Sequence, residues 1–493
     1  MGKQLSFVVK LSLEEMALRR VVVNLWTEAD VLDTIEKLLF GLPFDEEDIL
    51  YWNEIDQLKF EIMHSNQWRE INEAVEAKVS ELAISESLKK RMMHTVRPIG
   101  LEMLRWRLLF HEVHIGESGE VLYMHVPQLC WTSVGAVDFR KTAEWLVRLE
   151  TLDVVKRFKL SCLYCLEDYI SLLWEELPEA YKSRFNDLDD MYFIDTQTHL
   201  EFYWAYAVKG EESKLHYFVS RKVDNVSSLH KLAFEASARG GEKAATEYFL
   251  QKLTNEERDS FLFEIVCTVA LGGCVSGVPK EKYSDVLCYL LCVMTPAEKV
   301  QILNRDPGNV LGCLLDWPWQ DLFLDIADLT WTFLPKTSYC NVLSIISERI
   351  KHTGYYFPNV LQEFFLRSPS DFRKLFAFNF DAFFSPCSCV PETETLEVIF
   401  RNIDLGDKTE LVSSSGFSKL LRLFVVRGEW HIVEVCLREV LLSKEDCERL
   451  RKSFLNCCGM IQFRDCSYDK SKFDRFYELL DRTEASAPFK ARY

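Results

Sequence analysis

The sequence has few of the two residues that most often interrupt regular structure. Its 19 glycines and 14 prolines together make up under 7% of 493 residues, whereas average usage is about 12%. Strand-and-turn folds and flexible linkers both need more of these residues, so the shortage favours long helices joined by short loops. We therefore predict an all-α fold with little or no β-structure.

The chain also lacks a long apolar run. Its most apolar window, residues 261–275, is broken by Glu264 and by two glycines, and it is shorter than the roughly 20 residues that a membrane-spanning helix needs. At the N-terminus, Lys10 interrupts what would be the apolar core of a secretory signal. We expect no membrane-spanning helix and no leader, and a cytoplasmic location with the nucleus as the alternative.

Positive charge is in short supply. The 58 lysines and arginines are outnumbered by 76 aspartates and glutamates, which gives a formal net charge of −18 that is spread along the chain. Such a field repels phosphate backbones and anionic lipids. We therefore expect neither nucleic acid nor a membrane as a partner, and we expect the charge to speed encounters with basic proteins.

Catalytic signatures are missing as well. The sequence contains no phosphate-binding loop, dinucleotide-binding glycine motif, zinc-protease helix motif or nucleophile elbow. His111 and His114 are three residues apart, whereas a zinc-protease helix needs its histidines four apart, so we interpret them as surface residues. Cys162 and Cys165 form a lone C-x-x-C pair, without the second pair of a zinc ribbon or the βαβ context of a redox motif. We place both on a buried helix face.

Two further groups of residues could carry chemistry. Asp187, Asp189 and Asp190 are clustered, but the glycine and the glutamate that an EF-hand requires at its sixth and twelfth positions are absent. Cys387 and Cys389 lie in a predicted loop, where an exposed thiol could react. Most of the sixteen cysteines sit in apolar runs and are expected to be buried and reduced. We assign no catalytic, cofactor-binding or metal-binding residue.

What the chain does have is a recurring helix pair. Residues 228–261 are predicted to form two helices joined by a reversal at Gly240 and Gly241, and similar units surround Gly210 and Gly428. The facing sides of the two helices carry small and apolar residues, namely Leu232, Ala233, Ala236, Ser237, Ala244, Ala245, Tyr248, Phe249 and Leu253. Such a pair cannot bury its own apolar face, so its recurrence predicts stacking into an α-solenoid.

Two interruptions divide the predicted helices. Residues 116–127 show an alternating pattern bounded by glycines, which predicts a loop or short hairpin. Residues 271–284 are the one stretch rich in glycine, serine and proline, which predicts a hinge. Between them we predict single helices over residues 131–150 and 154–177. The resulting division is an N-terminal helical region (1–115), a loop or short hairpin (116–127), helical repeats (128–270), a hinge (271–284), C-terminal helical repeats (285–482) and a frayed tail (483–493).

The stretch Ser-Leu-His-Lys-Leu-Ala from Ser228 to Ala233 resembles Thr-Pro-Leu-His-x-Ala, the opening of an ankyrin repeat. Gly240 and Tyr248 then fall near the turn and second-helix positions of that family. The sequence departs from the family in lacking its Gly-Ala-Asp hairpin segment and in its many aromatic residues, so a solenoid of the HEAT or TPR kind is the alternative. The resemblance implies a scaffold that binds protein without a cofactor, and no contact residue is carried over.

These observations favour a non-catalytic helical-repeat scaffold that mediates protein–protein binding through a face of stacked helices. One alternative is an enzyme with its site near His111 and His114 or near residues 387–389, for which a deep pocket with convergent polar groups would be the mark. The other is a self-associating structural protein, which would assemble as its concentration rises.

Overall fold

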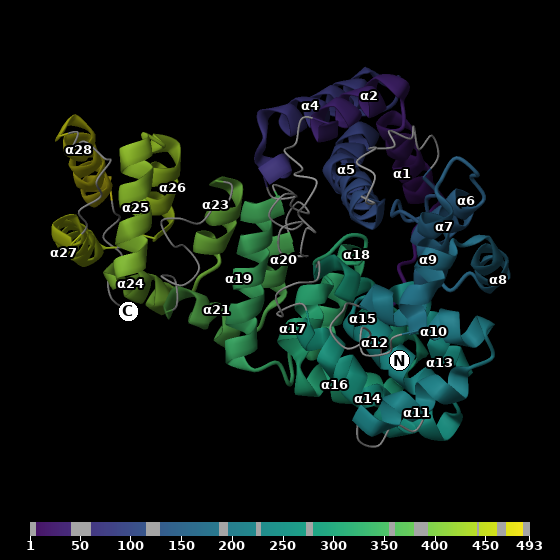
Figure 1. Ribbon diagram of the computed structural model, residues 1–493. Helices are drawn as coiled ribbons and strands as arrows, with labels where there is room; N and C mark the ends of the chain where they lie inside the picture. The colour runs from purple at the N-terminus through teal and green to yellow at the C-terminus, as the bar shows by residue number, and fades with distance from the viewer. Residues whose placement is uncertain are drawn as a thin grey trace. The chain divides into compact units, whose positions relative to one another are not determined.

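The structure is a computed structural model of the chain (Figure 1). It describes residues 6–40, 61–114, 129–186, 196–222, 228–272, 280–353, 360–378, 393–440, 443–460 and 470–486. The chain divides into two compact units, Met1–Phe323 and Leu324–Tyr493.

The helices that begin in the first unit are α1 (Leu13–Trp26), α2 (Ala29–Phe40), α4 (Asn66–Glu81), α5 (Glu86–His114), α6 (Phe139–Val147), α7 (Val154–Leu163), α8 (Glu167–Glu176), α9 (Glu179–Lys182), the 3-10 helix η1 (Ser183–Asn186), α10 (Thr196–Val208), α11 (Glu212–Lys222), α12 (Leu229–Arg239), α13 (Lys243–Lys252), α14 (Asn255–Gly272), α15 (Lys280–Val293), α16 (Pro296–Arg305), α17 (Pro307–Cys313) and α18 (Gln320–Thr330). Those of the second unit are α19 (Lys336–Thr353), α20 (Val360–Arg367), α21 (Ser370–Phe378), α23 (Thr393–Arg401), α24 (Leu405–Ser413), α25 (Ser415–Arg427), α26 (Trp430–Val440), α27 (Lys444–Met460) and α28 (Lys470–Ser486).

The all-α prediction is confirmed. Within the described residues there is no strand, and the bridge recorded outside strands is an isolated antiparallel one between Trp131 and Val137. Among the described helices, none combines the length and the apolar character that crossing a bilayer requires.

Helices in both units pack in two rows. In the first unit α10, α12, α14 and α16 contact one another in succession, and so do α13, α15 and α17. In the second unit one succession is α20, α23, α26 and α28 and the other is α19, α21, α24 and α27 (Figure 1). Stacked helix hairpins pack in this way. The extension of this packing into a single solenoid stays a prediction.

The reversals in the three predicted units share one geometry. Gly210, Gly241 and Gly428 adopt φ angles of +66°, +73° and +76°, in the left-handed region that glycine enters without steric cost. After each glycine, the next amide N–H donates to the carbonyl five residues back, as in the 2.9 Å bond from Glu429 N to Phe424 O. This is the Schellman end of a helix, and it confirms the helix pair at all three places.

A fourth reversal of this kind has no glycine. Cys165 adopts a φ of +51°, and Leu166 N donates to the carbonyl of Ser161 at 2.9 Å. The turn divides residues 154–177 into α7 and α8, so the prediction of a single helix there is wrong. The sequence conceals the turn because neither glycine nor proline marks it.

The predicted helix over residues 131–150 is too long. Residues 129–138 form a tight turn in which Gly135 has a φ of +77°, and α6 begins only at Phe139. The side chain of Asp138 caps α6, since it accepts a hydrogen bond from Lys141 N at 3.1 Å. A capping aspartate inside the predicted helix marks the true start.

The buried face of the unit at residues 228–261 is displaced by one position. Leu232 and Ala236, predicted in the core, are half-buried, and Phe234 and Ala238 take their place. The Phe234 ring lies 5.6 Å from that of Phe261, centroid to centroid. Burying a phenylalanine removes more apolar surface from water than burying a leucine, which explains the rotation.

The predicted hinge, residues 271–284, lies in part outside the described residues. The helices on either side of it, α14 and α15, pack against each other within the first unit. The boundary between the two compact units lies elsewhere, within α18 after Phe323. The division of the chain at residues 115, 127 and 270 stays a prediction.

Replacing Gly428 by valine is expected to lower the free energy of unfolding by more than about 1 kcal/mol, because a β-branched residue then has to adopt a left-handed φ. Urea unfolding followed by circular dichroism measures the change. Gly240 provides the matched control, since its φ is −82° and Gly240→Val should cost clearly less. Equal losses at the two positions would contradict the assignment of the turn.

Candidate functional site

The structure places the residues considered for chemistry in separate segments. His111 and His114 lie on the last turn of α5, and their side chains fall outside the described part, as do the loops with the aspartates at 187–190 and the cysteines at 387–389. Among the described residues, no group of three or more histidine, cysteine, aspartate or glutamate side chains is arranged to hold a metal ion.

Cys162 and Cys165 are both buried and free, but they do not share a helix face. Cys162 lies on the last turn of α7, and Cys165 forms the left-handed turn that follows. Burial raises the pKa of the Cys165 thiol to about 12 and also raises the pKa of Cys162. A thiol with a raised pKa is a poor nucleophile at neutral pH, so this environment does not favour thiolate chemistry at either cysteine.

In the native protein, Cys162 and Cys165 are expected to resist alkylation by iodoacetamide at mildly alkaline pH, and to react fully once guanidinium unfolds the chain. Mass spectrometry of the peptides measures both. Because the folded pKa exceeds the unfolded value of about 8.5, the unfolded chain loses these protons first, and stability should fall as the pH rises above that value. Native labelling of Cys165 at the rate of the unfolded chain would show that the thiol is accessible.

A buried polar cluster joins the beginning and the end of the first unit. Arg19 of α1 is only 3% exposed, and its guanidinium donates to the carbonyl of Val134 at 2.9 Å and to Oδ2 of Asp321 at 2.6 Å. Its Cζ lies 4.5 Å from the ring centroid of Trp317, a favourable cation–π distance. Trp317 donates from Nε1 to the carbonyl of Gly135 at 3.0 Å. One arginine therefore ties α1 to the turn at residues 129–138 and to the start of α18.

Arg105 continues the cluster on α5. Its Nη1 donates to Glu102 at 3.3 Å, its Nη2 lies 3.8 Å from the carboxylate of Asp285 on α15, and its Cζ lies 5.2 Å from the ring centroid of Phe139. Glu102 also accepts a bond from Val137 N at 3.2 Å. The closure cluster, as we name it, consists of Arg19, Glu102, Arg105, Asp285, Trp317 and Asp321.

The charges of the closure cluster are paired within the protein, although Nε of Arg19 is buried without a hydrogen-bond partner. Each arginine contacts a carboxylate, and Asp285 also accepts a bond from Trp319 Nε1 at 2.9 Å. Buried charges need such partners, because an isolated one is very costly. In an open solenoid each repeat contacts only its neighbours, whereas Arg19 and Asp321 are 302 positions apart. The first unit thus closes on itself.

Replacing Arg19 by methionine removes two hydrogen bonds and leaves Asp321 without its cation. We expect a loss of about 2 to 4 kcal/mol in the free energy of unfolding, measured in urea, with the partial exposure of Asp321 keeping it below the full cost of breaking a buried pair. The exposed neighbour Arg20 is the control, and Arg20→Met should change stability by about 0.5 kcal/mol or less. Similar losses of unfolding free energy for the two variants would show that the contacts of Arg19 contribute no more to stability than those of an exposed arginine.

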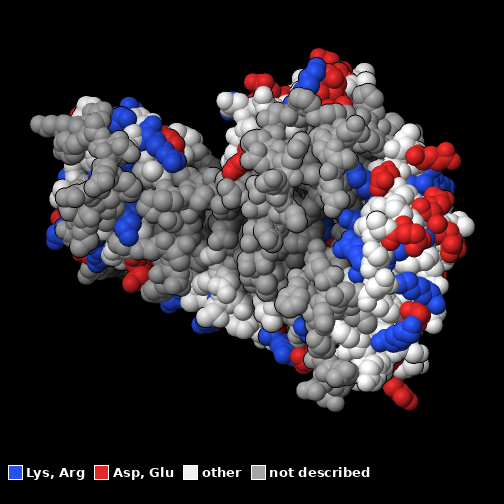
Figure 2. All heavy atoms as spheres, viewed as in Figure 1, with Lys and Arg blue, Asp and Glu red and all other residues white. Residues whose placement is uncertain are grey.

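The exposed face of α8 is the second feature that stands out. Figure 2 shows acidic side chains gathered over this helix, which also carries Leu172, 65% exposed. The residues of this acidic face are Glu167, Asp168, Leu172, Glu175 and Glu176. Glu167 lies 3.5 Å from Lys252 Nζ and Glu176 lies 3.6 Å from Arg157 Nη1. Within the described part of the chain, Asp168 and Glu175 have no ion-pair partner.

Half of this charge is at the unfavourable end of the helix. Glu167 and Asp168 lie in the first turn of α8, where the helix dipole stabilises negative charge. Glu175 and Glu176 lie in the last turn, which contains no basic residue, and there the dipole disfavours them by about 0.3 to 1 kcal/mol each. A local departure of this kind is expected where a surface serves another purpose than stability.

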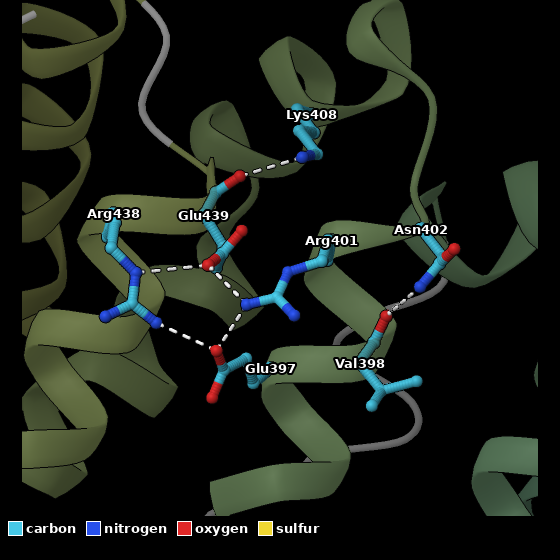
Figure 3. Close-up of polar contacts among 7 residues, drawn as sticks. All are labelled: Glu397, Val398, Arg401, Asn402, Lys408, Arg438 and Glu439. Atoms are coloured by element: carbon cyan, nitrogen blue, oxygen red, sulfur yellow. Dashed lines mark hydrogen bonds and ion pairs between the residues drawn. The ribbon is translucent and has the colours of Figure 1, made fainter.

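A polar ring in the second unit joins α23 and α26 (Figure 3). Arg401 contacts Glu397 and lies 3.2 Å from Glu439, and Arg438 contacts the same two carboxylates at 3.0 and 3.1 Å. Burial opposes the ionisation of Glu439, but bonds from both arginines outweigh it and lower its pKa. The gain is therefore present above the ordinary glutamate pKa and is lost as the pH falls through the lowered one.

This ring is complete within the protein. Its two negative and two positive side chains cancel, and Lys408 Nζ donates to the main-chain carbonyl of Glu439 at 2.8 Å, near the end of α26, where a cation is favourable. The ring thus fixes two helices and offers no unpaired charge to a ligand.

No protein-family model matches the chain, and no curated protein sequence matches it either. Function is therefore inferred from the residues described above. Sequence patterns do not reveal the closure cluster, because its members are scattered over 300 positions, but the acidic last turn of α8 is legible in the sequence once the helix ends are known.

Proposed function

We propose that the protein is a non-catalytic helical-repeat scaffold that binds another protein. The observation that carries this proposal is the recurrence of one helix hairpin, closed by the same left-handed turn at residues 165, 210, 241 and 428. Repeated hairpins present an extended surface of aligned helices, and recognition of other macromolecules is the common use of such surfaces. The resemblance of residues 228–233 to an ankyrin opening supports the same role.

The acidic face of α8 is the docking surface that we assign to this scaffold. A basic amphipathic segment of a partner would cover Leu172 and neutralise Asp168 and Glu175. Neutralising Glu175 would also offset its unfavourable position in the last turn of α8. The net charge of −18 would speed the encounter at low ionic strength and lose this effect as salt screens it. The proposed partner is therefore a basic protein.

Affinity capture from cell extract tests the proposal with two variants of equal charge change. Asp168→Lys combined with Glu175→Lys reverses the unpaired charges on α8 and should lose the partner that the unchanged protein captures in stoichiometric amount. Glu410→Lys combined with Glu434→Lys is the control. Both residues are exposed on the second unit and have no ion-pair partner within the described residues, so this variant should retain the partner.

Two results would count against the proposal. If no stoichiometric protein is captured at low or physiological salt, the scaffold function fails. If both lysine variants retain the partner equally, the scaffold stands but the acidic face of α8 is not its docking surface. Circular dichroism of each variant checks that the fold is unchanged.

A further inference from the structure

Residues 6–12, which we call the arm, lie directly before α1. Its side chains alternate between interior and solvent: Phe7 is only 1% exposed, Val9 and Leu11 are half-buried, and Val8 is 51% exposed. The arm is neither helix nor strand. It is therefore seated like a bound peptide, through one aromatic anchor followed by apolar residues at every second position.

The seat of the arm includes α15. Cys292 of α15 donates from Sγ to the carbonyl of Phe7 at 3.3 Å. Within the described residues, this is the one hydrogen bond that residues 6–11 receive from the rest of the unit. A thiol is a weak donor, so the arm is held by its side chains and not by a hydrogen-bonded ladder.

The far end of the arm is well fixed. Ser12 caps α1, since its Oγ accepts a bond from Glu15 N at 3.1 Å, and Arg19 anchors α1 through the closure cluster. The arm is therefore fixed to α1 at Ser12 and contacts α15 at Phe7. Because residues 6–11 receive one weak hydrogen bond within the described part of the unit, the arm can open without breaking a ladder of backbone hydrogen bonds.

We propose that the arm is an internal ligand, and that its seat on α15 binds in trans an extended segment of a partner with an aromatic residue followed by apolar residues two and four positions later. This inference rests on the proposed scaffold function and adds a second contact to it. The tethered arm competes with such a segment at an effective concentration on the order of 1 mM, so the seat becomes available when the arm leaves.

A purified two-component assay tests the seat. The protein is prepared without residues 1–11, which keeps the Ser12 cap, and is titrated against a fluorescent synthetic peptide of residues 1–12 by polarisation. We expect saturable binding that is at least tenfold tighter than to the full chain, where the arm occupies the seat. A peptide with Phe7→Ala should lose binding, and the matched peptide with Val8→Ala, altered at an exposed position, should bind like the parent.

Failure of the folded, truncated protein to bind the parent peptide would overturn the inference, and so would equal binding of the Phe7→Ala peptide. If truncation prevents folding, the full chain with Phe7→Ala replaces it, because its arm lacks the anchor, and the same two results decide. Neither outcome depends on extract proteins or on α8. The failure of this seat and the failure of the scaffold function are therefore distinguishable.

Discussion

The first unit depends on the guanidinium of Arg19. Its two hydrogen-bond partners, Val134 and Asp321, are 115 and 302 positions away along the sequence, and its aromatic partner Trp317 is bonded in turn to the turn at residues 129–138. In a stack of helix pairs each pair is stabilised by its neighbours, so stacking alone does not bring the last helices into contact with the first. The buried Arg19 links the two ends of the unit, because losing the carboxylate partner of a buried charge is costly. Closure also sets the direction of α1, and with it the path of the arm towards α15.

The second unit is held together in a different way. Its polar ring of Glu397, Arg401, Arg438 and Glu439 lies largely at the surface, where both arginines are 57% exposed, and exposed ion pairs contribute about 0 to 1 kcal/mol each. The stability of this unit therefore comes from its apolar rows, in which Tyr339 stacks on Phe364 at 5.4 Å and Phe454 stacks on Phe476 at 4.2 Å between ring centroids. The ring sets the register of α23 against α26, while the aromatic core supplies the free energy.

Sequence reasoning succeeded where the signal is local. The shortage of glycine and proline identified the helical class, and Gly210, Gly241 and Gly428 marked three turns because a left-handed residue is most often glycine. It failed at Cys165, which adopts the same conformation without the usual residue, and on α12, where the packing of Phe234 against Phe261 rotated the buried face by one position. The closure cluster was out of reach, because no local pattern shows that residues 19, 134 and 321 meet. The exposure of Leu172 on α8 could not be predicted until the turn at Cys165 showed where that helix starts.

The two surfaces proposed for binding would act through different physical effects. Exposed carboxylates such as Asp168 and Glu175 act at long range and raise the rate of encounter, but they add little affinity in water because solvent screens them. A buried aromatic anchor acts only on contact and is where interfaces concentrate their binding energy. A scaffold with only the first would bind basic proteins without discrimination, and one with only the second would bind slowly. In the proposed function, the charge pattern of α8 would therefore favour the arrival of a partner, and the seat that Phe7 occupies would favour its retention.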